Sequence, residues 1–237
     1  MGNNLSVKDI ARMIDHSLLR PTLTDEEYHE GIELALKYKC ATVCVAPYDV
    51  ERSAELLKGS DVLVSTVVDF PHGSNLTEAK VFEAERAIER GARELDMVLA
   101  ISRLAAGNFD YVEQDIRAVV ETAHAKNVVV KVIFETCYLT PEKIVKACRI
   151  CEKAAADYVK TSTGYGPGGA TLEDVRLMRQ SVSPKVAVKA AGGIRTLEHV
   201  LEYRAAGAKM IGTRATAAIL EEAMKREAEG TLKEINF

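Results

Sequence analysis

Three lysines at equal spacing are the residues whose type and pattern best suit chemistry in this sequence. Lys131, Lys160 and Lys189 recur at intervals of 29 residues, and each lies in a short apolar run typical of a strand. A fourth run, Leu95–Val98, holds Asp96 among apolar side chains. If these runs are strands of one barrel, the three ammonium groups share its interior with the Asp96 carboxylate.

A lysine in such a cluster can act as a nucleophile because its amine loses its proton more readily there. An unperturbed lysine, with a pKa near about 10.4, is protonated at neutral pH and attacks carbonyls poorly. Burial and neighbouring positive charge both lower the pKa, and a neutral amine forms a Schiff base with a carbonyl compound. Lys160 is the middle lysine and gains most from this effect, while Asp96 can move protons directly or through a water. The pattern indicates a lyase that acts on carbonyl compounds.

A simpler interpretation is that these lysines extend outward, or pair with acids between strand and helix. For a single lysine in a strand, that interpretation is the more common one. Three lysines at equal spacing with a matched aspartate favour the shared interior instead, since burying three cations together is otherwise costly.

Short β-rich runs alternate with helical stretches along the whole chain. The strand candidates are Met13–Ser17, Thr42–Ala46, Val62–Val68, Glu94–Ala100, Val128–Phe134, Tyr158–Ser162, Lys185–Ala190 and Lys209–Thr213. Eight strand–helix units in about 250 residues predict an α/β fold, a (β/α)8 TIM barrel, with a doubly wound open sheet as the alternative. No linker or shift in composition divides the chain, so residues 1–237 are expected to form one catalytic domain.

Helix start and stop signals separate the strand candidates. Thr24–Glu27 and Thr171–Asp174 resemble capping boxes, and Pro141 follows Thr140 at an expected helix start. Gly91 and Gly207 follow apolar-periodic helices at the position where a helix ends in a left-handed conformation.

Composition narrows the class of protein. The 31 basic and 35 acidic residues give a net charge of −4, which lacks the basic excess that nucleic-acid binding requires. No apolar run reaches the roughly 18 residues that span a bilayer, and no signal-peptide pattern is present. The myristoylation pattern at Met1–Ser6 lacks a second anchor. Five cysteines fit reduced thiols, so a cytoplasmic protein is expected.

Glycine loops follow the last three strand candidates. Gly164, Gly166 and Gly169 satisfy the G-x-G-x-x-G pattern, but Lys189 stands where a dinucleotide-binding unit requires an acid. A flexible loop at a barrel mouth is the better interpretation. Ala190–Arg195 and Ile211–Arg214 follow strands seven and eight, where barrels often hold a substrate phosphate on backbone amides. Tight turns with no ligand are the alternative for these glycines.

Four motifs together resemble the deoxyribose-phosphate aldolase family. They are Val159–Gly164, Val188–Arg195, Leu95–Val98 and Ile14–His16, and the similarity extends from about residue 9 to about residue 220. The resemblance implies a class I aldolase of barrel fold that needs no metal and no cofactor. Members of this family reversibly cleave 2-deoxy-D-ribose 5-phosphate into acetaldehyde and D-glyceraldehyde 3-phosphate. They are usually homodimers or homotetramers.

The resemblance also implies roles for individual residues. Lys160 would be the Schiff-base nucleophile, Lys189 would lower the pKa of Lys160 and help to move protons, and Asp96 would be the proton donor or acceptor. Residues expected to line the substrate site are Asp15, Cys44, Lys131, Thr163, Gly164, Gly192, Gly193, Arg195, Gly212 and Arg214.

One position departs from the family pattern. After Gly212 and Thr213 the family usually has two serines, whereas this chain has Arg214 and Ala215. Our hypothesis is that Arg214 replaces the missing hydroxyl donors with a charge-assisted contact to phosphate. Two alternatives stay open: a related barrel aldolase or isomerase acting on another sugar or sugar phosphate, and a non-catalytic barrel that binds sugar phosphates.

Several other residues are expected to be structural. Cys148 and Cys151 form a Cys-x-x-Cys pair inside a predicted helix, with no second pair that would suggest a metal site. His16 is expected to form a structural hydrogen bond. Cys44, at a strand end, could meet a reactive aldehyde, although a small buried side chain is the simpler interpretation.

Overall fold

The computed structural model describes residues 3–235 and shows a closed barrel of eight parallel strands in sequential order. The strands are β1 (Ile14–Leu18), β2 (Thr42–Val45), β3 (Leu63–Val68), β4 (Glu94–Val98), β5 (Val129–Ile133), β6 (Tyr158–Lys160), β7 (Ala187–Ala191) and β8 (Ala208–Thr213). The predicted (β/α)8 barrel is therefore confirmed, and the open-sheet alternative is wrong, because β1 pairs with β8. Met1 and Gly2, which begin the myristoylation pattern, lie outside the described residues.

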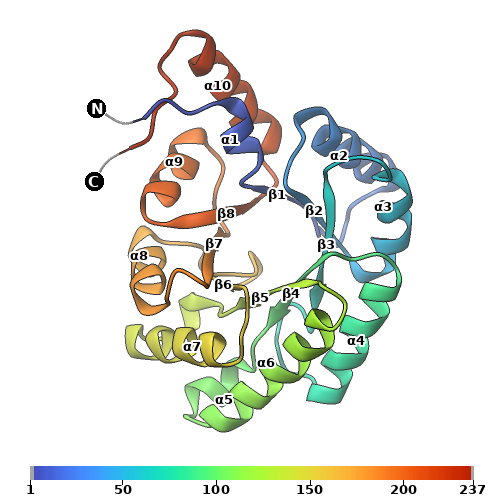
Figure 1. Ribbon diagram of the computed structural model, residues 1–237, viewed down its shortest axis with the longest axis vertical. Coiled ribbons are helices and arrows are strands. Elements are labelled where there is room, and N and C mark those ends of the chain that lie inside the picture. The colour runs from blue at the N-terminus through green and yellow to red at the C-terminus, as the bar shows by residue number, and fades with distance from the viewer. Residues whose placement is uncertain (1–2, 236–237) are drawn as a thin grey trace.

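Helices surround the barrel, as Figure 1 shows. The α-helices are α1 (Val7–Ala11), α2 (Asp25–Tyr38), α3 (Val50–Leu56), α4 (Thr77–Glu89), α5 (Ile101–Ala105), α6 (Phe109–His124), α7 (Pro141–Lys153), α8 (Leu172–Ser181), α9 (Leu197–Ala205) and α10 (Thr216–Ala228). Two short 3-10 helices, η1 (Pro47–Asp49) and η2 (Thr136–Tyr138), follow β2 and β5. The main hydrophobic core includes residues from both the strands and the surrounding helices.

The strand β5 shows how one apolar run supplies both the core and the site. Val130, Val132 and Phe134 belong to the main hydrophobic core. Because side chains alternate along a strand, Lys131 and Ile133 point the other way, into the barrel. A parallel strand covered on both sides reads as a continuous apolar run, and a lysine within it is correspondingly conspicuous.

The expected helix boundaries largely match the structure. Thr24 and Glu27 form a reciprocal capping box at the start of α2, whereas Thr171 accepts from the Asp174 amide without the return bond. Gly91 and Gly207 have positive φ angles of 111° and 107° after α4 and α9. Glycine adopts such angles without the Cβ clash that other residues meet.

The expected ends of β6 and β7 are wrong by one to two residues. The strand β6 ends at Lys160 rather than Ser162, and β7 begins at Ala187 rather than Lys185. Beyond Lys160 the chain leaves the regular ladder, although Thr161 still donates its amide to the Lys189 carbonyl at 3.1 Å. The glycine-rich loop that follows turns the chain across the barrel mouth, which a β-propensity pattern alone does not reveal.

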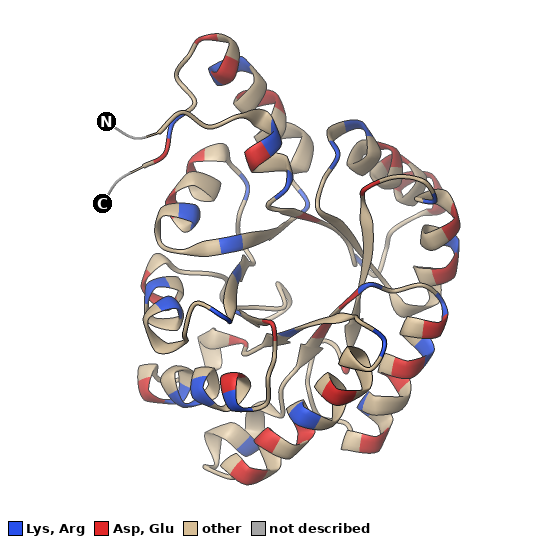
Figure 2. Cartoon of the chain, in the orientation of Figure 1, with Lys and Arg blue, Asp and Glu red and all other residues tan. Residues whose placement is uncertain are grey.

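Figure 2 shows charges of both signs interspersed over the outer helices. Within residues 3–235 no helix is long and apolar enough to cross a membrane.

One buried ion pair lies outside the barrel and attaches two helices to the loop after β3. The Lys80 ammonium, fully buried on α4, lies 2.7 Å from the Asp115 carboxylate of α6 and 3.2 Å from that of Asp69. It also donates to the Val98 carbonyl at 3.1 Å, and Thr77 donates to Asp115 at 2.9 Å. These bonds satisfy the buried charges, so removing the lysine leaves two carboxylates buried without their cation.

We therefore expect Lys80→Met to lower the free energy of unfolding by about 3–5 kcal/mol. Chemical denaturation followed by circular dichroism measures this change. Lys58→Met is the matched control, because its 4.0 Å ion pair with Glu55 is highly exposed and contributes little. Equal denaturation midpoints for the two variants would show that the buried pair does not stabilise the fold.

Candidate active site

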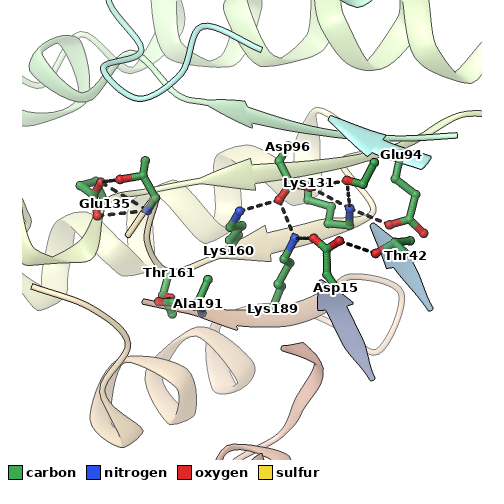
Figure 3. A network of polar contacts seen from close by, with 12 residues as sticks. Asp15, Thr42, Glu94, Asp96, Lys131, Glu135, Lys160, Thr161, Lys189 and Ala191 are labelled. Carbon is green, nitrogen blue, oxygen red and sulfur yellow. Dashed lines mark hydrogen bonds and ion pairs between the residues drawn. The ribbon is translucent and has the colours of Figure 1, made fainter. Parts of the chain in front are cut away.

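A single carboxylate connects the three lysines in the barrel interior (Figure 3). Asp96, on β4 and fully buried, lies with Oδ1 2.7 Å from the Lys131 ammonium. Its Oδ2 lies 2.5 Å from the ammonium nitrogens of both Lys160 and Lys189. All three lysines are at most 4% exposed, so their charged groups do not extend outward to solvent.

Two more carboxylates complete the cluster. Asp15, on β1, pairs with Lys189 and accepts a 2.5 Å hydrogen bond from the Thr42 hydroxyl. Glu94, two residues before Asp96 on β4, lies 2.6 Å from the Lys131 ammonium. Lys131 therefore has two carboxylate partners and Lys189 has two, whereas Lys160 has only Asp96.

The barrel register places the lysines in two layers rather than one. Lys160 is the direct neighbour of Lys189, but Lys131 is opposite Tyr158, two residues before Lys160. The equal sequence spacing therefore predicts the shared interior correctly but not the depth of Lys131. From this deeper position, Lys131 binds the oxygen of Asp96 that the other two lysines leave free.

The number of carboxylate partners differs among the three lysines, and their pKa values shift in different directions as a result. Burial lowers the pKa of Lys160 and the nearby Lys189 cation adds to this, while Asp96 only partly opposes them. Burial acts on Lys189 too, but Asp15 and Asp96 outweigh it and raise its pKa. The pKa of Lys131 is raised well above its usual value, because Asp96 and Glu94 likewise outweigh burial. Lys160 is thus the one lysine of the cluster whose pKa is lowered.

The carboxylate at the centre stays ionised. Burial would raise the pKa of Asp96, but the three neighbouring lysines lower it well below its usual value. An ionised carboxylate in contact with three lysine amino groups can receive a proton and return it.

A pocket of about 360 Å³ opens from this cluster to the mouth of the barrel. The sequence-predicted site residues that line it are Asp15, Cys44, Lys160, Thr163, Gly164, Lys189, Gly192, Gly193, Arg195, Gly212 and Arg214. Asp96 and Lys131 are fully buried and do not line it. Lys160, at the end of β6, therefore lines the pocket, while Asp96 contacts its amine without lining the pocket.

The loops after β7 and β8 form the outer wall of the pocket. Gly192 and Gly193 have positive φ angles of 89° and 80°, and a Cβ on Gly192 would lie 2.9 Å from the Cα of Gly169. Only glycine allows the loop after β7 to approach the loop after β6, where Gly169 lies, so closely. Arg214 is exposed here, and within residues 3–235 its side chain forms no hydrogen bond or ion pair, which leaves it free for an anion.

Three cysteines and His16 are buried, and none of the three cysteines forms a disulfide. Cys148 and Cys151 are buried on α7 and form no disulfide, as expected of core side chains. His16 forms a 2.8 Å hydrogen bond with Thr216, and burial lowers its pKa to about 4. Burial raises the pKa of the Cys44 thiol to about 12, so it is protonated in the pocket wall.

The donor atoms of Asp15, Cys44 and Asp96 lie within 4.8 Å of one another, which is close enough for a metal ion. Both carboxylates are already bonded to lysine ammonium groups, and the thiol is protonated. A cation there would displace those ammonium groups, so this donor set does not fit a metal.

Sequence reasoning did not assign a role to several residues of the site. Glu94 lies two positions before Asp96, and that i, i+2 spacing places both carboxylates on one face of a strand. This signal was present in the sequence. Glu135 and Tyr165 have no such signal, because their contacts depend on how separate loops meet at the barrel mouth. Thr42 has none either, because its bond to Asp15 depends on the register of β1 against β2.

A (β/α)8 barrel with a lysine of lowered pKa in its floor is built for lysine-based carbonyl chemistry. Residues 10–219 match the family described as DeoC/LacD family aldolase, and the chain belongs to this family.

Curated relatives match over most of the chain. The deoxyribose-phosphate aldolase of Rhodopirellula baltica is 50% identical over 218 residues, covering 92% of this chain and 90% of the relative. That of Thermococcus gammatolerans is 52% identical over 221 residues, covering 92% and 98%.

Solved structures agree with this assignment. A putative deoxyribose-phosphate aldolase from Coccidioides immitis superposes with a TM-score of 0.89 at 40% identity, covering 94% of this chain and 88% of that one. The deoxyribose phosphate aldolase of Aeropyrum pernix, described as having a unique tetrameric structure, gives 0.85 at 31% identity, covering 92% of each chain.

The electrostatics of Lys160 predict opposite effects for two substitutions. Lys189→Met removes a cation that lowers the pKa of Lys160, so this pKa should rise. Asp96→Asn removes an anion that raises the pKa of Lys160, so this pKa should fall. The measurement is the pH dependence of acetaldehyde trapping on Lys160 with cyanoborohydride, because only the neutral amine attacks the carbonyl.

The midpoint of trapping should move to higher pH in Lys189→Met and to lower pH in Asp96→Asn. A shift of both variants in the same direction would contradict the assigned electrostatics. Lys153→Met, on the exposed end of α7, serves as the control for changes in total lysine content.

Proposed function

We propose that this chain is a class I deoxyribose-phosphate aldolase that cleaves 2-deoxy-D-ribose 5-phosphate into acetaldehyde and D-glyceraldehyde 3-phosphate. The observation that carries the proposal is the position of Lys160, which lines the pocket, contacts Asp96 through its amine and has a lowered pKa. The names of the curated relatives support the same reaction.

In the proposed mechanism, the neutral Lys160 amine attacks the C1 aldehyde of the open-chain sugar. Loss of water gives an iminium, which withdraws electrons from the C2–C3 bond. That bond breaks as the C3 hydroxyl loses its proton, which releases glyceraldehyde 3-phosphate and leaves an enamine. Protonation at C2 and hydrolysis then release acetaldehyde and restore Lys160.

Asp96 and Lys189 are the groups that we propose move these protons. Asp96 lies 2.5 Å from both amines, so a proton taken from one can be returned to the other. The contact between Lys189 and Asp15 holds the Lys189 ammonium next to Lys160. Lys131 acts from below by fixing the second oxygen of Asp96.

The phosphate is proposed to lie in the wall formed by the loops after β7 and β8. Gly192, Gly193 and Gly212 bring the backbone close to the ligand, while Arg195 and Arg214 supply positive charge. The substrate-lining roles of Asp15, Cys44, Thr163 and Gly164 are likewise proposals, supported by their positions in the pocket.

The domain organisation, assembly and location of the protein are also proposals. We propose a single catalytic domain, residues 1–237, that works as a homodimer or homotetramer on small sugar phosphates and aldehydes, without metal, cofactor, nucleic acid or membrane. The tetrameric relative from Aeropyrum pernix supports assembly. The five cysteines form no disulfide, which supports a cytoplasmic location.

Borohydride reduction with deoxyribose 5-phosphate should yield one covalent adduct on Lys160, located by peptide mass mapping. The adduct should disappear in Lys160→Met and persist in the surface control Lys153→Met. An adduct on a different lysine would change the assigned nucleophile but keep the reaction class. If neither deoxyribose 5-phosphate nor acetaldehyde gives an adduct, the aldolase proposal is wrong and a binding or isomerase role replaces it.

The Arg214→Ser variant tests how the phosphate is held. We expect the ratio of kcat/KM for deoxyribose 5-phosphate to that for deoxyribose to fall about tenfold, because a charge-assisted contact is lost. Arg90→Ser, on the exposed end of α4, is the matched control and should leave the ratio unchanged. An unchanged ratio in Arg214→Ser would show that Arg214 does not contact the phosphate.

A further inference from the structure

Glu135 has an unusual backbone conformation immediately beyond the end of β5. Its φ is 54°, in the left-handed region that residues other than glycine seldom adopt, and only 2% of the residue is exposed. The neighbouring amides of Phe134 and Thr136 donate to the carbonyls of Lys160 and Thr161, each at 3.0 Å. These two bonds fix the backbone on both sides of Glu135 against the end of β6.

The Glu135 carboxylate is held by one residue of the loop after β6. Both of its oxygens lie 3.3 Å from the Thr163 amide nitrogen, and Oε2 accepts a short hydrogen bond from the Thr163 hydroxyl (Figure 3). Within residues 3–235 no lysine, arginine or histidine forms an ion pair with it. A buried carboxylate bonded only to neutral donors is costly, and strained backbones of this kind concentrate at functional sites.

The Thr163 hydroxyl also bonds to a residue further along the same loop. It accepts from the Tyr165 amide at 3.0 Å, so its proton is donated to Glu135 and it is not available as a donor to substrate. The Tyr165 hydroxyl then donates to the Leu19 carbonyl at 2.6 Å, and its ring meets Phe70 edge-on at 5.5 Å. The loop after β6 is therefore held at Glu135 and at the segment after β1.

This loop separates two cavities at the barrel mouth. Thr163 and Tyr165 line both the active-site pocket and a second cavity of about 280 Å³, which also contacts Glu135. A Cβ on Gly166 would lie 3.0 Å from the carboxyl carbon of Glu135, so the loop lies directly on this side chain. Loss of the Glu135 contact would therefore remove a bond that holds the pocket wall on the side of the second cavity.

We infer that Glu135 is a positioning residue for substrate binding, acting through Thr163 to fix the loop of residues 161–169 as the wall of the active-site pocket. The role in substrate binding rests on the proposed function, whereas the contact between Glu135 and the loop does not. The Phe134 amide bonds to the Lys160 carbonyl and the Thr136 amide to the Thr161 carbonyl. Because these backbone bonds do not involve the Glu135 side chain, its loss should affect the wall more than the nucleophile.

The test compares Glu135→Ala with Glu135→Gln, whose amide oxygen can still accept from Thr163. In Glu135→Ala we expect faster hydrogen exchange across residues 161–169 and a KM for deoxyribose 5-phosphate about tenfold higher. Acetaldehyde trapping at Lys160 and kcat should change by less than about threefold, since the backbone bonds to β6 remain. Glu135→Gln should restore slow exchange and most of the lost affinity.

Thr163→Val completes a double-mutant cycle. If Glu135 acts through the Thr163 hydroxyl, the double variant Glu135→Ala/Thr163→Val should raise KM little more than Glu135→Ala alone. Fully additive effects on KM would overturn this route.

The outcomes separate the inference from the proposed function. Unchanged exchange across residues 161–169 in Glu135→Ala overturns the loop contact, whatever reaction the wild type performs. Faster exchange with an unchanged KM, or equal losses in KM, trapping and thermal stability, overturns the role in substrate binding. A wild type that forms no Lys160 adduct refutes the aldolase reaction, and the exchange data still decide whether Glu135 holds the loop.

Discussion

Ionised groups in the dry interior of the barrel must balance one another, and the arrangement of the site follows from that constraint. The three ammonium groups of the interior are matched by three carboxylates, those of Asp15, Glu94 and Asp96. An unmatched charge there would cost several kcal/mol of folding free energy. Strand order and register meet this requirement, because Asp96 on β4 is directly opposite Lys131 on β5.

Overall charge balance does not require that each lysine have the same number of carboxylate partners, and the unequal numbers distinguish Lys160, the proposed nucleophile, from the other two lysines. Lys131 and Lys189 each contact two carboxylates, so their charged forms are stabilised despite complete burial. Lys160 contacts only Asp96 and also faces another cation, so burial lowers its pKa. The same desolvation acts on all three lysines, and the number of carboxylates within reach decides its effect on each.

Most of the barrel, and the identity of several of its buried charged residues, could be predicted from the sequence. Eight apolar runs predicted eight parallel strands, and the 29-residue spacing indicated that Lys131, Lys160 and Lys189 share one interior. Register could not be predicted from spacing, because helix and loop lengths vary between units while only strand pairing fixes depth. The role of Glu135 could not be predicted either, because its contact with Thr163 forms only when two loops meet in the folded chain. Its positive φ has no signal in the sequence.

The floor of the pocket is held by strand pairing and its wall by loop contacts. The lysines of the floor can therefore stay in place when the wall changes. The floor is built on strands whose ladders fix Lys160 and Lys189 side by side, so a change in a loop does not readily move the reacting amine. The wall is made of loops, which are held by scattered contacts such as the bond from the Tyr165 hydroxyl to the Leu19 carbonyl. We therefore expect substitutions in the wall, such as one at Arg214, to change what the pocket accepts without disturbing the buried surroundings that lower the pKa of Lys160.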